Sequence, residues 1–279
     1  LAGLRLILGN SIVSSILLSI LAIAAFSWVG ICSYNNQVDN PPTFVKNFSK
    51  YCTNISLKKL DEVNNTFTVE MANYEEAEEL EYDINLGVSK FTITDGGEEY
   101  LLLDANYNTE YGEPSIKELE RNSTLNIQVE EERADPLSFM NFKAPEYSFV
   151  LGSELLTNIN IDNGVGSGSI DLENQLIETL DITTGTGDVD IKLGFNSIPT
   201  EEIVLTVGTG DISLSLPPEA GYVLNYNLGV GTISLGGEDI GGIGEEGKEI
   251  RSDNYDDAFK IVNITADVGV GLLDINFSN

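Results

Sequence analysis

The sequence predicts an all-β repeat domain, built as a β-solenoid or as a stacked β-sandwich, that follows one long hydrophobic α-helix. Three observations carry this prediction. Residues 1–30 are almost entirely apolar, a glycine pair recurs through residues 82–279, and the residues on both sides of each pair alternate between apolar and polar. A long apolar run is typical of a membrane or buried helix, whereas alternation with a period of two is typical of half-buried strands.

These patterns divide the chain of 279 residues into three parts. Residues 1–31 form the predicted helix, residues 32–81 are a linker that leads into the next part, and residues 82–279 are the β-repeat ectodomain. The linker stretch Ser33–Phe44 is polar and contains two consecutive prolines, which indicates a stiff spacer.

The apolar segment is long enough to cross a bilayer as a helix, and Arg5 is its only charged residue. A basic residue at its start favours an inner N-terminus and an outer C-terminal domain. Ser11, Ser15 and Ser19 recur at a spacing of four, which places them on one helix face. Small polar residues on one face let helices approach closely, so we expect this face to pack against other helices.

The start of the chain leaves two explanations open. The first residue is Leu1 rather than Met, and no basic region precedes the apolar segment. Either the sequence is trimmed, or a leader is cleaved ahead of an apolar segment that is then retained. The second pattern is characteristic of type IV pilin-like proteins, and residues 1–30 resemble the N-terminal helix of archaeal pilins. That resemblance implies a filament core made of many such helices, and the other interpretation is a single-pass membrane anchor.

Two cysteines, Cys32 and Cys52, lie just beyond the apolar segment. In an oxidising compartment we expect them to form one disulfide across a short loop. The alternative is a pair of free thiols, with Cys32 near the membrane edge.

The Asn-x-Ser/Thr pattern for N-glycosylation occurs six times. This number fits a glycosylated cell-surface protein, and unused sequons are the alternative. The candidate asparagines are Asn47, Asn54, Asn64, Asn122, Asn263 and Asn276.

The repeat is defined by its glycines. Five Gly-x-Gly pairs begin at Gly164, Gly185, Gly208, Gly229 and Gly269, and a degenerate copy begins at Gly87. The intervals between the five pairs are 21, 23, 21 and 40 residues. Periodicity in this range indicates stacked structural units, each of which buries its apolar face only against its neighbours.

Apolar residues occupy fixed offsets around each pair, at −5, −3 and −1 before it and at +4 and +6 after it. Each unit is therefore predicted to be a strand, a glycine corner, a second strand and a return. Examples before the pair are Ile203, Leu205 and Val207, and examples after it are Ile212, Leu214, Val189 and Ile191. Outside this pattern, Tyr100–Asn108 and Ser123–Glu131 are expected to be strands without glycine corners.

Six stretches carry a family resemblance: YDINLGVSKFTI, NINIDNGVGSGSIDL, LDITTGTGDVDIKL, IVLTVGTGDISLSLP, YNLGVGTISLGG and ITADVGVGLLDINF. In this order they resemble the toast-rack family of adhesin-like β-solenoid domains, from about Tyr82 to Phe277. Such domains are ectodomains of bacterial and archaeal envelope proteins, including regulators of cell-wall stress. The resemblance implies that the glycines shape the rack and that the family pattern carries no catalytic residue.

One copy, DITTGTGDVDIKLG at Asp181–Gly194, has the features of a ligand loop. A dinucleotide site is not expected, because it needs a helix after the glycines and strands follow here. Calcium is a stronger alternative, although calcium-binding β-rolls repeat every nonapeptide rather than at this longer period. We expect structural glycines, which reach positive φ and allow close approach of coils. Asp181, Asp188 and Asp190 are expected on the solvent face.

Composition excludes several functional classes. Lys and Arg total 14 against 45 Asp and Glu, so the net charge of −31 would repel nucleic acid. The chain has no histidine, the commonest general base and zinc ligand. The acidic runs Glu75–Glu81 and Glu130–Glu132 are expected to be solvated faces rather than a glycosidase acid pair. We expect no catalytic residue, no cofactor and no metal site beyond weak divalent cation binding to the acidic surface.

The function predicted first is structural: a subunit of an extracellular type IV pilus-like filament, with residues 1–30 of many copies as its core and the acidic β-domain as its outer surface. This hypothesis requires insertion into the membrane before assembly and polymerisation with copies of the same chain. The alternative is a single-pass envelope protein whose toast-rack domain scaffolds or senses partners. An enzyme is not expected.

Overall fold

The computed structural model describes residues 62–108, 112–131, 144–152 and 155–277. They form thirteen strands and one short 3-10 helix, η1 (Met71–Asn73). The strands are β1 (Glu62–Val69), β2 (Glu79–Asp95), β3 (Leu101–Asn108), β4 (Pro114–Arg121), β5 (Thr124–Glu131), β6 (Glu146–Leu151), β7 (Leu156–Leu172), β8 (Ile177–Thr186), β9 (Val189–Leu193), β10 (Glu202–Leu216), β11 (Ala220–Leu235), β12 (Glu238–Arg251) and β13 (Lys260–Phe277).

The all-β prediction is confirmed for the described residues, including the strands expected near Tyr100–Asn108 and Ser123–Glu131. Strands begin ahead of Tyr82, the residue at which the repeat becomes recognisable. The predicted N-terminal helix lies outside the described residues, and so do Arg5, the three serines of its packing face and both cysteines. Within the ranges described, no helix has the length and apolar character to cross a membrane.

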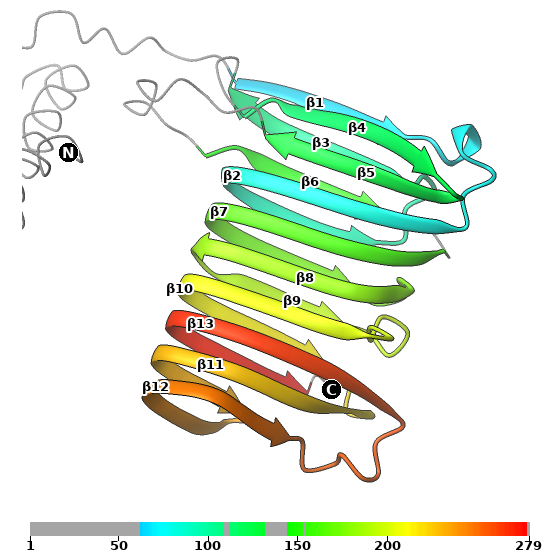
Figure 1. Cartoon of the computed structure of the whole chain (residues 1–279). Helices are drawn as coiled ribbons and strands as arrows, with labels where there is room; N and C mark the ends of the chain where they lie inside the picture. Colours follow the sequence, from blue (N-terminus) through cyan, green and yellow to red (C-terminus); the bar gives the residue numbers. More distant parts are fainter. Residues whose placement is uncertain (1–61, 109–111, 132–143, 153–154, 278–279) are drawn as a thin grey trace, which may run out of the picture. The chain divides into compact units, whose positions relative to one another are not determined.

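Long strands that bend at the glycine pair form the rungs of the fold (Figure 1). In β10, the half before the glycines pairs with β8, and the half after them pairs with β9. The chain thus follows one wall, turns at the glycine corner and continues along a second wall. A return loop then leads to the next rung. This path is that of a β-solenoid, which resolves the choice that the sequence leaves open between a solenoid and a sandwich.

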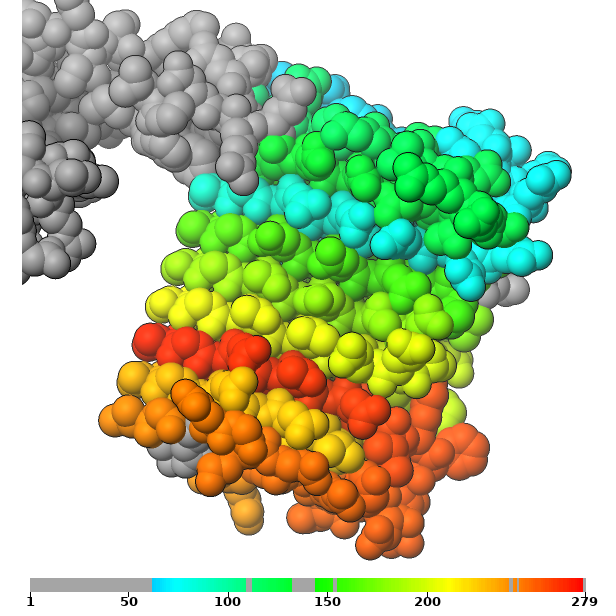
Figure 2. Space-filling view, in the orientation of Figure 1, coloured from blue at the N-terminus to red at the C-terminus, as the bar shows by residue number. Residues whose placement is uncertain are grey.

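Neighbouring rungs run parallel in the order β2, β7, β8 with β9, β10, β13 and β11. The C-terminal strand β13 lies between β10 and β11 and pairs with both, as the red band in Figure 2 shows. The strand β12 runs antiparallel to β11 at the end of the stack. The long interval between Gly229 and Gly269 therefore contains an antiparallel rung.

The alternating positions of the repeat form the core, as the sequence predicts. Six side chains of β10 are at most 2% exposed: Ile203, Leu205, Val207, Ile212, Leu214 and Leu216. Each is level with its equivalents on the neighbouring rungs, as Leu205 is with Ile182 and Ala266. A slip by one residue would turn this whole set outward, so burial fixes the register.

At each end of the stack, the last strand of the first wall has a charged residue opposite a core residue. On β12, Lys248 lies opposite the buried Tyr226, and on β4, Glu118 lies opposite the buried Ile127. Both charged residues are exposed. A charge at a position that would otherwise extend the core hinders the addition of a further rung, so β12 and β4 act as terminating strands.

Candidate functional site

The glycine corner is a close contact between backbones of successive rungs. Gly187 has φ +139°, and a Cβ placed there would lie 1.6 Å from the carbonyl oxygen of Gly166 on the rung before it. No side chain fits at that distance. The second glycine of the other pairs is in the same situation, at Gly166, Gly210, Gly231 and Gly271.

The first glycine of each pair is also packed against backbone. A Cβ at Gly185 would lie 2.5 Å from the carbonyl oxygen of Gly164. The degenerate first copy differs, because a Cβ at Gly87 would meet only the side chain of Glu131 at 3.4–3.5 Å. The corner thus needs glycine wherever another rung lies beneath it, which supports the structural interpretation of the motif.

The two carboxylates that directly follow glycine pairs accept hydrogen bonds from backbone N–H groups. Asp188 Oδ1 accepts a hydrogen bond from the Asp211 N–H at 3.1 Å, and Asp211 Oδ1 accepts one from the Leu272 N–H at 2.9 Å. Each side chain therefore links its rung to the next. In the described part of the chain, no group of three or more acidic or sulfur ligands is arranged to hold a metal ion.

The other two aspartates of that stretch differ in exposure. Asp190 is exposed, as expected for the solvent face, whereas Asp181 is half-buried. Burial, with the charges of Glu202 and Asp162 as smaller causes, raises the pKa of the Asp181 carboxyl above its ordinary value. The outer face of the first wall therefore concentrates negative charge.

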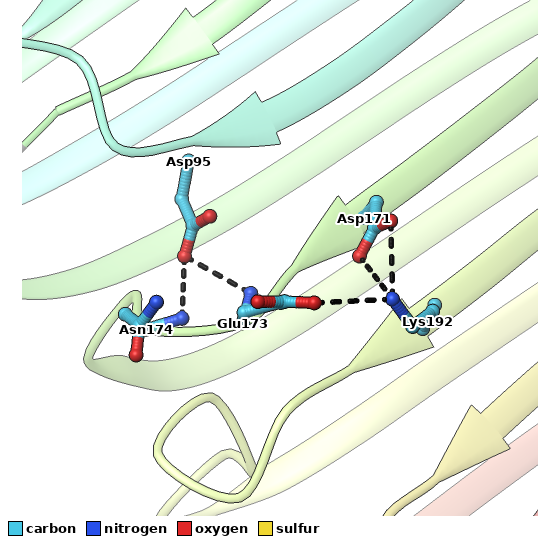
Figure 3. A network of polar contacts seen from close by, with 5 residues as sticks. All are labelled: Asp95, Asp171, Glu173, Asn174 and Lys192. Atoms are coloured by element: carbon cyan, nitrogen blue, oxygen red, sulfur yellow. Dashed lines mark hydrogen bonds and ion pairs between the residues drawn. The ribbon is translucent and has the colours of Figure 1, made fainter. Parts of the chain in front are cut away.

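The edge of the rungs opposite the glycine corner carries the return loops, and a further carboxylate forms hydrogen bonds with one of them. Asp95, at the end of β2, accepts hydrogen bonds from the N–H groups of Glu173 and Gln175 at 3.0 Å and from that of Asn174 between them. Figure 3 shows the first two residues of this turn around the Asp95 carboxylate. Three otherwise free donors of the loop between β7 and β8 are thereby satisfied.

The same loop is flanked by an ion pair. Lys192 Nζ lies 3.2 Å from Asp171 Oδ1 and 3.2 Å from Glu173 Oε1 (Figure 3). All three side chains are substantially exposed, so solvent screens the attraction and its contribution to stability is small. The hydrogen bonds of Asp95 therefore restrain this turn more than the ion pair does.

A groove of about 1260 Å³ opens beside this turn, and we call it the return-loop groove. Its wall is formed by η1 and the residues after it, by the turn that follows β2, and by the loop between β7 and β8. Apolar side chains contribute to its lining, among them Met71, Ala77 and Leu176, together with Glu75 and Glu98. None of the described lining residues is basic.

A second depression, of about 790 Å³, lies on the outer face of the second wall. It combines Lys90 with Asp104, Glu146 and Asp190, and hydroxyl-bearing residues lie between them. Because both signs of charge line it, it favours no ligand of one charge. The return-loop groove is therefore the candidate binding site of this domain.

Comparison with known proteins identifies the family to which the fold belongs. A family model described as the N-terminal domain of toast_rack, DUF2154, matches residues 58–215, more than half of the chain. The chain belongs to the toast-rack family. A second model, described as cell wall-active antibiotics response LiaF, C-terminal, matches residues 176–275 of this toast-rack chain. No curated protein sequence matches it.

One solved structure supports the fold. A crystal structure of a candidate cell adhesion protein from Clostridium sporogenes has 18% identity and a TM-score of 0.61, and the match covers 78% of this chain and 100% of that one. A candidate adhesin from Bacteroides fragilis has 11% identity, a TM-score of 0.28 and coverages of 77% and 97%. The latter TM-score is too low to support an argument. None of these matches supports the resemblance of residues 1–30 to archaeal pilins.

Four of the six sequon asparagines lie in the described part of the toast-rack domain. Asn64 is exposed on the edge strand β1, and Asn122 is exposed in the hairpin turn between β4 and β5. Asn263 is exposed on β13, where its Nδ2 donates to the Glu201 carbonyl at 3.4 Å. Asn276 donates to Asp274 Oδ2 at 2.6 Å. Asn47 and Asn54 lie outside the described residues.

The acidic runs are distributed along the toast-rack framework. Glu75 and Glu76 are exposed near the return-loop groove, and Glu130 pairs with Lys117 at 2.7 Å. Glu131 accepts the Gly87 N–H at 2.8 Å. Burial raises the pKa of the Glu131 carboxyl, and hydrogen bonds from the backbone oppose that shift. Glu131 is therefore half-buried and bonded to backbone, not part of a solvated face as expected, and Glu132 lies outside the described residues.

Proposed function

We propose that the protein is a single-pass, membrane-anchored protein of the cell envelope whose toast-rack domain scaffolds or senses partner proteins, without enzymatic activity. The observation that carries this proposal is the match of residues 176–275 to a family model described by a response to cell wall-active antibiotics. The predicted helix at residues 1–30 would supply the anchor, and the disulfide between Cys32 and Cys52 stays a prediction for the segment that follows it.

The geometry supports a scaffold. Glycine corners that touch through backbone, a continuous apolar core and carboxylates that hold neighbouring rungs together produce a stiff support. Loops positioned on such a support are the usual carriers of binding functions. The return loops of this domain, which differ from rung to rung, have that placement.

The filament hypothesis depends on residues 1–30, which lie outside the described residues, and type IV pilus assembly stays a prediction. Family membership favours the envelope protein, because the toast-rack domain is the larger part of the chain. The charged positions of β12 and β4 also hinder the addition of a further rung along those two strands.

Cell fractionation tests this proposal. After mechanical shearing of cells that produce the tagged full chain, we expect the protein to stay in the membrane fraction. We also expect deletion of its gene to change the sensitivity of the cells to a cell wall-active antibiotic. Recovery of the chain in sheared extracellular filaments, with unchanged antibiotic sensitivity, would contradict the proposal and favour the pilus.

A further inference from the structure

Two exposed apolar features lie along the return-loop edge of the rungs. Met71 and Leu176, on the wall of the return-loop groove, are 36% and 43% exposed. Phe195 and Phe259 form a ring pair with centroids 5.5 Å apart, and they are 39% and 82% exposed. Asn196, which follows Phe195, also lines the groove. The ring pair therefore adjoins the groove, and a path along the return-loop edge leads from one to the other.

This path crosses successive return loops, from the β2 rung through β7, β8 and β10 to the loop ahead of β13. Neighbouring strands lie about 4.8 Å apart, so the path is roughly 19 Å long. An extended segment of about six residues covers that length. Large exposed aromatic and aliphatic side chains gathered on one edge are typical of protein docking surfaces.

The charged residues that line the groove, among those described, are all acidic. Glu75 and Glu98 are exposed, and Glu99 accepts the Met71 N–H at 2.7 Å. With no basic residue among the described lining residues, nothing in the lining neutralises these carboxylates. Lysine or arginine side chains of a partner would therefore be attracted to the groove, and an acidic partner would be repelled.

We infer that the return-loop groove and the adjoining ring pair bind a basic segment of another protein that carries large apolar side chains. One apolar side chain would contact Met71 and Leu176, a second would contact Phe259, and basic side chains would lie opposite Glu75 and Glu98. This inference rests on the proposed function and specifies how the toast-rack domain recognises a partner.

Two other occupants fit less well. A second copy of the chain brings a net charge of −31 to an acidic groove, so electrostatic repulsion opposes self-association there. A membrane surface with anionic headgroups is repelled by the same carboxylates. Contact with neutral lipid is one outcome of the test.

The test measures binding of a fluorescent 12-residue peptide of alternating leucine and lysine to the full chain in neutral detergent, by fluorescence anisotropy. Two pairs of variants separate groove recognition from general attraction to an acidic protein. Phe259→Ser is compared with Leu119→Ser, because Leu119 is an exposed leucine of β4 away from the groove. The double variant Glu75→Gln/Glu98→Gln is compared with Glu238→Gln/Glu246→Gln, which removes the same charge from exposed positions on β12.

We expect Phe259→Ser and Glu75→Gln/Glu98→Gln each to weaken peptide binding about tenfold, and both control variants to stay within about twofold of the unmodified chain. Equal weakening by the two charge variants would overturn the inference, since it would reveal attraction to net charge alone. Displacement of the peptide by a soluble short-chain phosphatidylcholine would overturn it in favour of lipid. If peptide binding does not depend on the groove residues but the chain is still found in the membrane fraction, this inference is wrong and the proposed function still stands.

Discussion

The two edges of the same rungs, the glycine corner and the return-loop edge, are built for different tasks. At the corner the five rungs with a complete glycine pair repeat one backbone geometry, Gly187 excludes a side chain, and Asp188 accepts a hydrogen bond from the next rung. At the return-loop edge, each loop has its own length and sequence, and Leu176, Phe195 and Phe259 are left exposed. Regularity stabilises the stack, and the irregular edge is where recognition becomes possible.

The largest expected effect tests the corner. We expect Gly187→Ala to lower the free energy of unfolding by at least about 3 kcal/mol, because the methyl group would meet the Gly166 carbonyl as well as strain the backbone. Gly237→Ala should cost only about 1–2 kcal/mol, since Gly237 has positive φ but nothing within 4 Å of its Cβ position. Urea unfolding of the full chain and both variants measures the difference.

The first corner provides the matched control. Gly87→Ala is expected to be tolerated, because the added methyl group would make an ordinary contact with the Glu131 side chain. Equal losses for Gly187→Ala and Gly237→Ala would contradict backbone contact as the reason for the glycine pairs.

An intermediate effect tests the return-loop edge. Asp95→Ala removes the acceptor of three N–H groups in the turn after β7, and we expect a loss of about 1–2 kcal/mol. Asp190→Ala, at an exposed position of β9, should change stability by less than about 0.5 kcal/mol. Amide exchange of residues 173–175 should be faster in Asp95→Ala, and unchanged exchange there would show that the carboxylate does not hold the turn.

The smallest expected effect concerns the outer face of the first wall. Burial and the charges of Glu202 and Asp162 raise the folded-state pKa of Asp181, so its ionised form is disfavoured by folding. Its contribution to stability therefore improves as pH falls through that raised pKa and levels off below the unfolded pKa. We expect Asp181→Asn to raise stability at pH 7 by less than about 1 kcal/mol, because solvent screens a half-buried group.

Urea midpoints measured between pH 7 and pH 4 check this expectation. The stability advantage of Asp181→Asn over the unmodified chain should shrink as the pH is lowered. An advantage that is the same at every pH would mean that Asp181 is not the group that titrates.

The contrast between the edges also separates what the sequence predicts from what it does not. The two-residue period places Leu205 and Leu214 in the core, because burial of one strand face is a local property. The position of β13 has no such signal. The corners of β10 and β11 are 21 residues apart, from Gly208 to Gly229, as are those of the adjacent rungs β7 and β8. Whether another strand separates two rungs depends on competition between distant segments.

The hydrogen bonds of Asp95, Asp188 and Asp211 were equally unpredictable from the pattern. An aspartate beside a glycine corner looks solvated in the sequence, and its partner is a backbone N–H of a rung 23 or 61 residues away. The return-loop groove joins η1, the turn after β2 and the loop after β7, none of which shows the alternating apolar pattern of the repeat. A short Asp-Gly-Gly sequence at Asp95 was its one local signal, since it marks a turn.

Hydrogen–deuterium exchange of the full chain, with and without the leucine–lysine peptide, is the most direct test of the two roles. It shows whether the glycine corner is a structural support and whether the return-loop edge is the surface that binds the peptide. We predict slower exchange on peptide addition at residues 71–77, 96–100 and 174–176, with no change at the corner residues 185–188 and 208–211. Protection of the corner residues, with the return-loop edge unaffected, would contradict this division of roles.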